Sequence, residues 1–219
     1  MTQAGRPKDM STQTVKRKRQ IEPQAVRRQQ LIDAAIECIA SHGIADTTLA
    51  RVTRTAGLSI GMVNLHFNSK EELFAAALRF MVSEHEEIWS SGLANPEASA
   101  LPKRLLIIAD AHFLPAVCDR TRLSAWYAFF GEAKSRAFYL GVADDADNAR
   151  KSEILRICSS VAIEGGYDCD PQLVALTLEA MFDGLWLNML LYPEEFSPQR
   201  AKLQIRQFLA CIFPRHHWT

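Results

Sequence analysis

The sequence predicts an all-α protein in which a small N-terminal helix-turn-helix head precedes a larger helical bundle. Apolar residues recur at helical spacing through most of the chain, and no segment shows the alternation of a half-buried strand. Residues 47–73 have the spacing of two short helices that pack across a tight turn. The charged residues are distributed unequally, although the 219 residues include 25 basic and 25 acidic side chains.

This charge distribution separates the two ends of the chain. Residues 1–70 contain 11 basic and 5 acidic side chains, a net charge of +6, whereas residues 71–219 contain 14 and 20, a net charge of −6. A basic head on an acidic body is typical of a protein that presents one end to phosphates. We expect a disordered basic arm over 1–24, a DNA-binding domain over 25–70, and a ligand-binding and dimerisation domain over 71–219.

The expected arm lacks apolar periodicity and contains four consecutive bases, Lys16, Arg17, Lys18 and Arg19. Two interpretations remain open. These bases order on DNA, where they follow phosphates or enter a minor groove, or they form a solvated tail that adds nonspecific attraction.

Helices are expected on both sides of the first turn. Before it, Ile32, Ala35, Ile36 and Ile39 share one face of a helix that ends at Gly43. A second helix begins at Thr47 or Thr48 and carries the apolar residues Leu49, Val52 and Ala56. Gly57 ends it, because glycine readily adopts the left-handed conformation, and Leu58 follows as a buried residue.

Ser59 is expected to cap the third helix. Helical spacing directs Ile60, Val63 and Phe67 inward and Gly61, Met62, Asn64 and Leu65 outward, with His66 near the end. Small residues allow close approach to another backbone, and the Asn64 amide can pair with an adenine edge in the major groove. This pattern is typical of a recognition helix, although an ordinary helical hairpin has the same turn.

A longer helix should follow, capped by Ser69, with Glu71 and Glu72 in its first turn. Its apolar stripe comprises Leu73, Ala77, Phe80 and Met81. The three-helix head therefore continues into a long helical connector.

The segment GLSIGMVNLHFNSKEEL resembles the TetR family of bacterial transcriptional repressors. The matching residues are Gly57, Ser59, Gly61, His66, Phe67, Ser69, Lys70, Glu71, Glu72 and Leu73. The chain departs from the family where a tyrosine is common, at Asn64 or Leu65, and where a threonine is common, at Met62. The residues expected to contact DNA are Thr48, Ser59, Gly61, Met62, Asn64, Leu65, His66 and Lys70.

In the body, further helices are expected from 101 to a break near Pro115, over 122–133, and over 138–164, where Gly165 and Gly166 follow. Asp170 and Pro171 begin a helix that is apolar nearly all round, and a last helix covers 197–212. An all-round apolar helix needs burial on more than one side, which favours a homodimer.

The resemblance implies that this last pair of helices forms a four-helix bundle with a second copy. The expected interface residues are Gly184, Ile205, Phe208, Leu209 and Ile212. An intramolecular core is the alternative interpretation of the same stripe.

The segments AWYAFF and DGLWLNMLL resemble the ligand domain of the subfamily typified by the choline-responsive repressor of glycine betaine synthesis. Trp126, Phe130 and Trp186, with Asp183 or Asp110 beside them, are therefore candidates to bind a small organic ligand, with a cationic one first. Ordinary aromatic packing is the alternative, with an arginine as the partner of Asp183.

Other classes of function find little support. The chain lacks GxSxG, GxxxxGK[ST], HExxH and GxGxxG, so we expect no enzyme and no cofactor. Five cysteines without a CxxC pair indicate neither a disulfide framework nor a metal site, and Asp144, Asp145 and Asp147 are more typical of a helix start than of metal ligands. No uninterrupted apolar run is long enough to span a bilayer, which predicts a cytoplasmic protein without a membrane partner.

We therefore expect a ligand-responsive, homodimeric repressor that binds a palindromic operator on double-stranded DNA and is released by a small-molecule effector. Two alternatives stay open. One is an all-helical enzyme or ligand-binding protein that uses the helix-turn-helix as a scaffold, and the other is a transcriptional activator.

Overall fold

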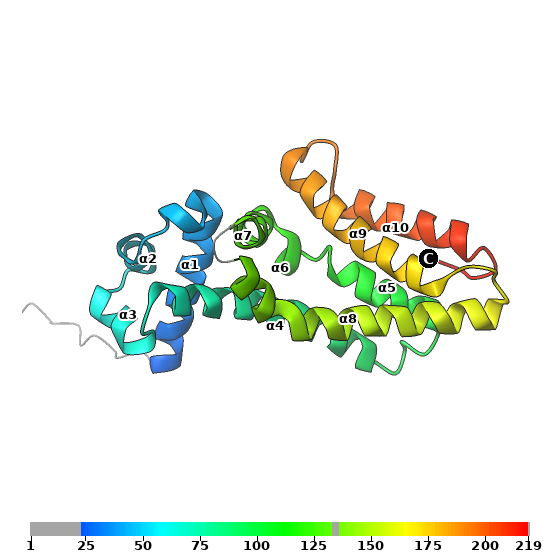
Figure 1. Cartoon of the computed structure of the whole chain (residues 1–219), viewed down its shortest axis with the longest axis horizontal. Coiled ribbons are helices and arrows are strands. Elements are labelled where there is room, and N and C mark those ends of the chain that lie inside the picture. Colours follow the sequence, from blue (N-terminus) through cyan, green and yellow to red (C-terminus); the bar gives the residue numbers. More distant parts are fainter. Residues whose placement is uncertain (1–22, 133–135, 219) are drawn as a thin grey trace, which may run out of the picture.

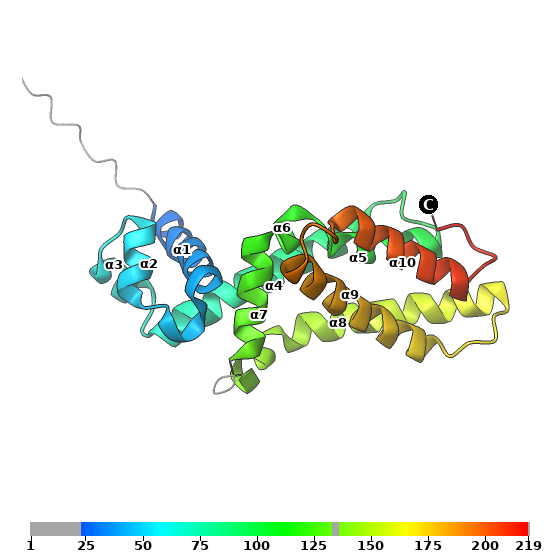
Figure 2. The same cartoon turned by 90° about the horizontal axis from the view of Figure 1, so that it is seen from above.

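The computed structural model describes residues 23–132 and 136–218. All regular structure within these residues is helical, which confirms the predicted fold class. The molecule is elongated, with α1, α2 and α3 at one end and α5, α8, α9 and α10 packed together at the other (Figures 1 and 2). The helices are α1 (Gln24–Asp46), α2 (Leu49–Ala56), α3 (Ile60–His66), α4 (Lys70–Ala94), α5 (Leu101–Ala111), α6 (Pro115–Cys118), α7 (Arg120–Gly131), α8 (Arg136–Gly165), α9 (Pro171–Leu191) and α10 (Pro198–Ile212).

The turn between α2 and α3 forms largely through the local chemistry that the sequence predicts, although the Ser59 side chain, expected to cap α3, forms no capping hydrogen bond. The Thr48 side chain caps α2 by accepting a hydrogen bond from the backbone N–H of Arg51 at 3.3 Å. Gly57 then takes a φ of 66°, a left-handed conformation that strains other residues. Val63 and Phe67 are buried in the core that α3 shares with α1.

Two of the predicted orientations in α3 are wrong. Ile60 was expected to point inward but is 50% exposed, because it is the first residue of the helix and lies at its open end. Met62 was expected on the outward face but is partly buried, and its long, flexible side chain packs against the core. The outward face of α3 is therefore narrower than the periodicity predicts.

α1 shows the predicted break at Gly43, where φ is 74° and ψ is 172°, although helical residues continue to Asp46. The hydroxyl of Thr47 donates to the Gly43 carbonyl at 2.6 Å, and the Thr47 side chain is fully buried. Thr47 thus closes this turn, while its neighbour Thr48 caps the next helix.

α4 connects the two ends of the molecule. The Ser69 hydroxyl caps it by accepting from the Glu72 N–H at 3.0 Å. The helix has 25 residues, and at about 1.5 Å per residue it is long enough to pass from the head into the body. It packs on α1 at one end and on α5 and α8 farther along, so the expected boundary near residue 70 falls at the start of a helix that both parts share.

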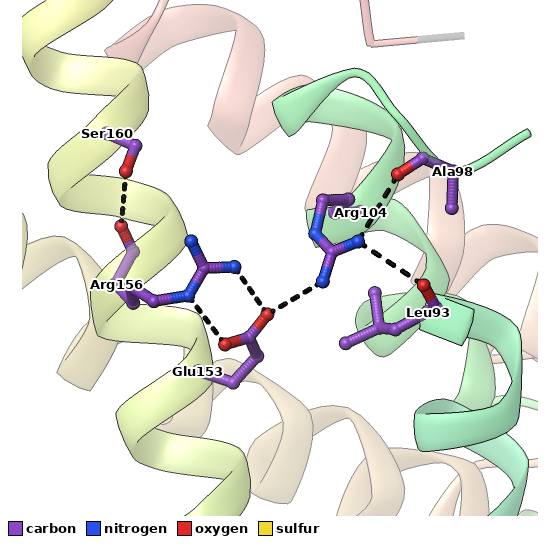
Figure 3. Close-up of polar contacts among 6 residues, drawn as sticks. All are labelled: Leu93, Ala98, Arg104, Glu153, Arg156 and Ser160. Atoms are coloured by element: carbon purple, nitrogen blue, oxygen red, sulfur yellow. Dashed lines mark hydrogen bonds and ion pairs between the residues drawn. The ribbon is translucent and has the colours of Figure 1, made fainter. Parts of the chain in front are cut away.

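A charged cluster joins α5 to α8 (Figure 3). Arg104 on α5 donates to the carbonyls of Leu93 and Ala98 at 3.3 and 3.4 Å, and to Glu153 on α8 at 3.2 Å. Glu153 also accepts two hydrogen bonds of 2.7 Å from Arg156, and Arg156 and Arg104 lower the pKa of its carboxyl group. Arg104 therefore ties the loop after α4 and both helices together.

α9 begins as predicted, with Asp170 accepting hydrogen bonds from the Gln172 and Leu173 N–H groups and Pro171 in the first helical position. Among the helices that the structure describes, α9 alone has the length and hydropathy to cross a membrane, with a mean hydropathy of 1.4. The sequence analysis expected no such helix because Glu179 and Asp183 interrupt the apolar run, but the mean hydropathy of the segment stays high in spite of these two charges. α9 packs on α7, α8 and α10, as a core helix does.

The predicted interface stripe on α10 is wrong in part. Ile205 and Leu209 are fully buried within the chain's own core, and Phe208 and Ile212 are partly buried against it. Ile205 and Leu209 therefore belong to the chain's own core, whereas a place for Phe208 and Ile212 in an interface stays a prediction. Leu203 of α10 is exposed, and so is a different apolar stripe, spaced by three and four residues along α9: Leu173, Leu176, Ala180, Gly184, Leu187 and Leu191.

Candidate functional sites

The expected DNA-contacting residues divide into two groups. Thr48, Ser59, Gly61, Asn64 and Leu65 are exposed, and Leu65 is 63% exposed. The surface at Gly61 is open, since an added Cβ would meet only the Ser59 hydroxyl, at 3.8 Å. The exposed part of α3 thus offers one amide side chain, Asn64, between the open surface at Gly61 and the exposed side chain of Leu65.

Met62, His66 and Lys70 are partly buried, which makes them less available than expected. The Lys70 ammonium group donates to the Ile44 carbonyl at 3.3 Å and lies 5.1 Å from the centre of the Phe74 ring. Lys70 therefore connects the end of α1 to α4 instead of extending freely from the head.

Other basic residues of the head are exposed, and sequence reasoning did not single them out. Arg51 and Arg54 are exposed on α2, and Arg28 is exposed on α1 with its guanidinium 5.1 Å from the Phe67 ring centre. They add exposed positive charge to helices that pack beside α3. The arm residues Lys16, Arg17, Lys18 and Arg19 lie outside the described residues.

The body contains a cavity of about 570 Å³ between α4, α7, α8 and α9. Four of the five candidate ligand residues, Trp126, Phe130, Asp183 and Trp186, line it together. The remaining lining residues are Val82, His85, Glu86, Trp89, His112, Tyr127, Leu140, Ala146, Asp147, Arg150, Lys151, Glu179, Ala180 and Phe182.

Stacked aromatic rings form one wall of this cavity. The centroid of the Trp126 ring lies 5.7 Å from that of Phe130 and 6.0 Å from that of Trp186. The rings are stacked, with interplanar angles of 18° and 29°. The Trp186 indole donates to the His112 carbonyl at 2.8 Å, and the Tyr127 hydroxyl donates to the Asp183 carbonyl at 2.7 Å. These bonds fix the rings, whose faces attract cations.

The charged residues at the cavity leave an excess of negative charge. Four carboxylates line it, and Arg150 and Lys151 are the only lysine or arginine residues among the lining residues. Arg150 forms two hydrogen bonds to Glu179, at 2.8 and 3.2 Å, and one to Asp147 at 2.8 Å. The other two carboxylates, Glu86 and Asp183, form no ion pair with any residue in the described part of the chain.

Asp183 is the acid whose environment is least favourable to its charge. Burial raises the pKa of its carboxyl group, and the nearby Glu179 raises it further, against a smaller opposing effect of Arg150. The predicted arginine partner is thus nearby but is occupied by Glu179 and Asp147. A cation placed beside Asp183 would stabilise the ionised carboxylate.

Two histidines lie deep at the cavity. His85 on α4 and His112 after α5 are 5% and 2% exposed, and their rings meet edge to face with centroids 4.5 Å apart. Burial, and to a smaller extent the charge of Arg150, lowers the pKa of His85 to about 3, while burial also holds the pKa of His112 well below its usual value. Both imidazoles are therefore neutral near pH 7.

Asp110 does not line this cavity, so the prediction that it lies beside the aromatic residues of the ligand site is wrong. It forms a two-pronged ion pair with Arg206 of α10, with N–O distances of 2.8 and 2.9 Å. The pair lies at a separate cavity of about 360 Å³ that also includes Lys103 and Leu106. The partner is 96 residues away in sequence, so local pattern gave no sign of it.

Sequence reasoning missed most of the cavity's polar residues. His85 lies one helical turn before Trp89 and continues the stripe that begins at Leu73, so a histidine on an apolar face was the available signal. Asp147, weighed above as a metal ligand, instead pairs with Arg150. Within residues 23–132 and 136–218, no group of three or more His, Cys, Asp or Glu side chains is placed to hold a metal.

Comparison with known proteins agrees with this arrangement. A family model described as "Bacterial regulatory proteins, tetR family" matches residues 31–77, and one described as "BetI-type transcriptional repressor, C-terminal" matches residues 102–214. The chain is 28% identical over 197 residues to the HTH-type transcriptional regulator BetI of Escherichia coli (strain K12), an alignment that covers 87% of this chain and 96% of the relative. The BetI regulator of Cronobacter sakazakii is 28% identical over 189 residues, with coverage of 85% and 90%.

Solved structures of similar fold include two regulators. A putative transcriptional regulator from Pseudomonas aeruginosa PAO1 has a TM-score of 0.76 and 26% identity, covering 89% of this chain and 93% of its own. A putative transcriptional regulator from Saccharomonospora viridis, solved in complex with choline, has a TM-score of 0.71 and 20% identity, covering 84% and 96%.

The buried histidines predict a loss of stability in mild acid. Their folded-state pKa values lie below the unfolded value near 6.5, so the unfolded chain binds more protons, and stability falls as the pH drops below that value. His85→Phe keeps a ring but cannot take up a proton. The free energy of unfolding of this variant should therefore fall less steeply with decreasing pH, with a slope that is smaller than that of the wild type by about 1.4 kcal/mol per pH unit. Urea unfolding at a series of pH values measures both slopes, and equal slopes would contradict the prediction.

Proposed function

Since the chain belongs to the TetR family of bacterial regulatory proteins and has a BetI-type transcriptional-repressor domain, we propose that it is a cytoplasmic, homodimeric repressor released from a palindromic operator by a small organic cation. Residues 25–70 are the DNA-binding part, and residues 71–219 form the ligand-binding and dimerisation part. The observation that carries the cationic effector is the cavity lined by stacked rings and by two carboxylates, Glu86 and Asp183, that form no ion pair within the described part of the chain.

The effector class follows from charge and shape. Rings alone would accept many apolar molecules, but a neutral or anionic ligand would leave Asp183 in the environment that raises its pKa. A quaternary ammonium ion has a charge spread over methyl groups, so it suits both ring faces and a carboxylate. The choline complex of the Saccharomonospora viridis regulator makes choline the first compound to test.

Two helices connect the cavity to the head. α7 carries Trp126 and Phe130 in the cavity wall and packs against α1, while α4 starts directly after the helix-turn-helix. Arg122 on α7 forms an ion pair with Glu84 on α4, with an N–O distance of 2.9 Å. A ligand that favours one arrangement of α4 and α7 therefore changes the positions of the two heads, which must fit major grooves about 34 Å apart.

The dimer should form through the exposed stripe on α9. Gly184 lies in the middle of this stripe and is exposed, and nothing lies within 4 Å of a Cβ added there. The four exposed leucines of the stripe and Leu203 on α10 give this face an apolar character that a twofold-related copy would cover.

We expect Asn64→Ala to weaken operator binding by about 1 to 3 kcal/mol while it leaves binding to random DNA nearly unchanged, because an exposed amide on α3 reads a base edge. The operator would first be selected from a pool of random sequences, and both affinities would be measured by gel shift. Asn148→Ala, an exposed asparagine on α8, is the control. Equal losses on both DNAs would show that Asn64 does not read bases.

Gly184→Trp should convert the dimer to monomers, because it inserts bulk at the centre of the proposed contact. Gly141→Trp is the matched control, since Gly141 is exposed on α8 and also has no atom within 4 Å of an added Cβ. Sedimentation at micromolar concentration measures both. A monomeric wild type, or a Gly184→Trp variant that remains dimeric, would contradict this interface.

Choline should quench or shift the tryptophan fluorescence and release the protein from its operator. Asp183→Asn should weaken choline binding about threefold to tenfold, as expected for the loss of a partly exposed charge pair. Asp145→Asn, an exposed acid outside the cavity lining, should have no effect. No response of either signal to millimolar choline or related cations would refute the cationic effector.

A further inference from the structure

His85 presents hydrogen-bonding capacity that the protein itself does not use. Its side chain comes from α4 and lines the cavity, yet it is 5% exposed. Its Nε2 atom is enclosed and has no hydrogen-bond partner among the described residues. A buried polar atom without a partner costs free energy, so this position calls for an explanation.

The polar groups nearest to His85 are already occupied. His112 Nδ1 lies 2.9 Å from the Ile108 carbonyl, and because a carbonyl oxygen can only accept, this nitrogen carries the proton. The Trp186 indole N–H donates its hydrogen bond to the His112 carbonyl. His112 also stacks on Phe182 at 3.9 Å, which holds its ring in place. The Nδ1–H of His112 and the indole N–H of Trp186 are therefore not available to His85.

The charge state of His85 defines the kind of group it suits. With a pKa of about 3, its imidazole is neutral near pH 7 and has one N–H donor and one acceptor nitrogen. It therefore does not repel a cation held by the neighbouring rings. A hydroxyl group, which both donates and accepts, can pair with the imidazole in either of its neutral tautomers.

We propose that His85 is a specificity-determining residue whose imidazole hydrogen-bonds a hydroxyl group of the bound cation. This inference rests on the cationic effector proposed above. The His85 and Trp186 ring centroids are 6.1 Å apart, so a short alkyl chain can connect an ammonium group on the rings to a hydroxyl at His85. The charged group that acts on His85 is Arg150, which is already paired with Glu179 and Asp147. Glu86 and Asp183 leave the cavity an excess of negative charge, so the hydroxyl compound should be preferred to a betaine, which carries a carboxylate.

The test compares choline with propyltrimethylammonium, which has a methyl group in place of the hydroxyl. Calorimetry on the full-length wild-type protein should give a choline affinity roughly tenfold higher, the size expected for one satisfied hydrogen bond at a buried site. His85→Phe, which keeps the ring and removes both nitrogens, should bind the two compounds with affinities within about twofold of each other. His85→Gln, which keeps a donor and an acceptor, should retain part of the preference.

Val82→Ala is the matched control, because Val82 lines the same cavity from the same helix but offers only methyl groups. It should change the affinity for both compounds by the same factor. If the wild type binds both equally, or if His85→Phe keeps the full preference, the role of His85 is refuted and the cationic effector stands. If the wild type binds glycine betaine more tightly than choline, the hydroxyl assignment is likewise refuted. If neither cation binds, the proposed effector class fails, and the inference fails with it.

Discussion

The packing of α7 against α1 is the contact on which the rest of the structure depends, because one helix of 12 residues serves both the head and the cavity. Leu123, Ala125 and Phe129 bury α7 in the core, while Trp126 and Phe130 stack along the cavity wall. Interiors packed to crystal-like density transmit displacements instead of absorbing them. A ligand between Trp126 and the opposite wall therefore cannot move α7 without disturbing the surface on which α1 rests.

The second constraint is electrostatic and centres on Arg150. This guanidinium, with its side chain 12% exposed, is shared by Glu179 and Asp147, and sharing it leaves the charge of Asp183 only partly offset. Breaking such a buried pair is costly, so Arg150 is not free to turn toward Asp183. Among the described side chains, the negative charge of Asp183 is therefore only partly offset. The aromatic ring faces of the cavity also attract positive charge.

Local chemistry in the sequence was enough to predict most of the helices and several of their ends, although the short helix α6 and the missing Ser59 cap were not predicted. The caps at Thr48, Ser69 and Asp170 and the left-handed turn at Gly57 depend on neighbouring residues alone, and they form as expected. The four cavity residues were found because aromatic clusters with an acid are visible in the sequence. Periodicity could not say which neighbour covers an apolar face, so the assignments that failed, such as Leu209 to an interface and Asp110 to the cavity, depend on contacts between distant helices.

α9 has two apolar faces with different surroundings. Its inner face carries Phe182 and Trp186 into the cavity, and its outer face exposes the stripe that includes Leu176 and Gly184. The body core covers the inner face, while the outer face is exposed in the single chain and is covered by a second copy only under the proposed function. Because Asp183 and Gly184 are adjacent in the chain, a ligand that contacts Asp183 acts one residue away from the middle of the proposed dimer contact. Under the proposed function, the effector therefore has a short physical route to the geometry of the dimer as well as the route through α7 to the head.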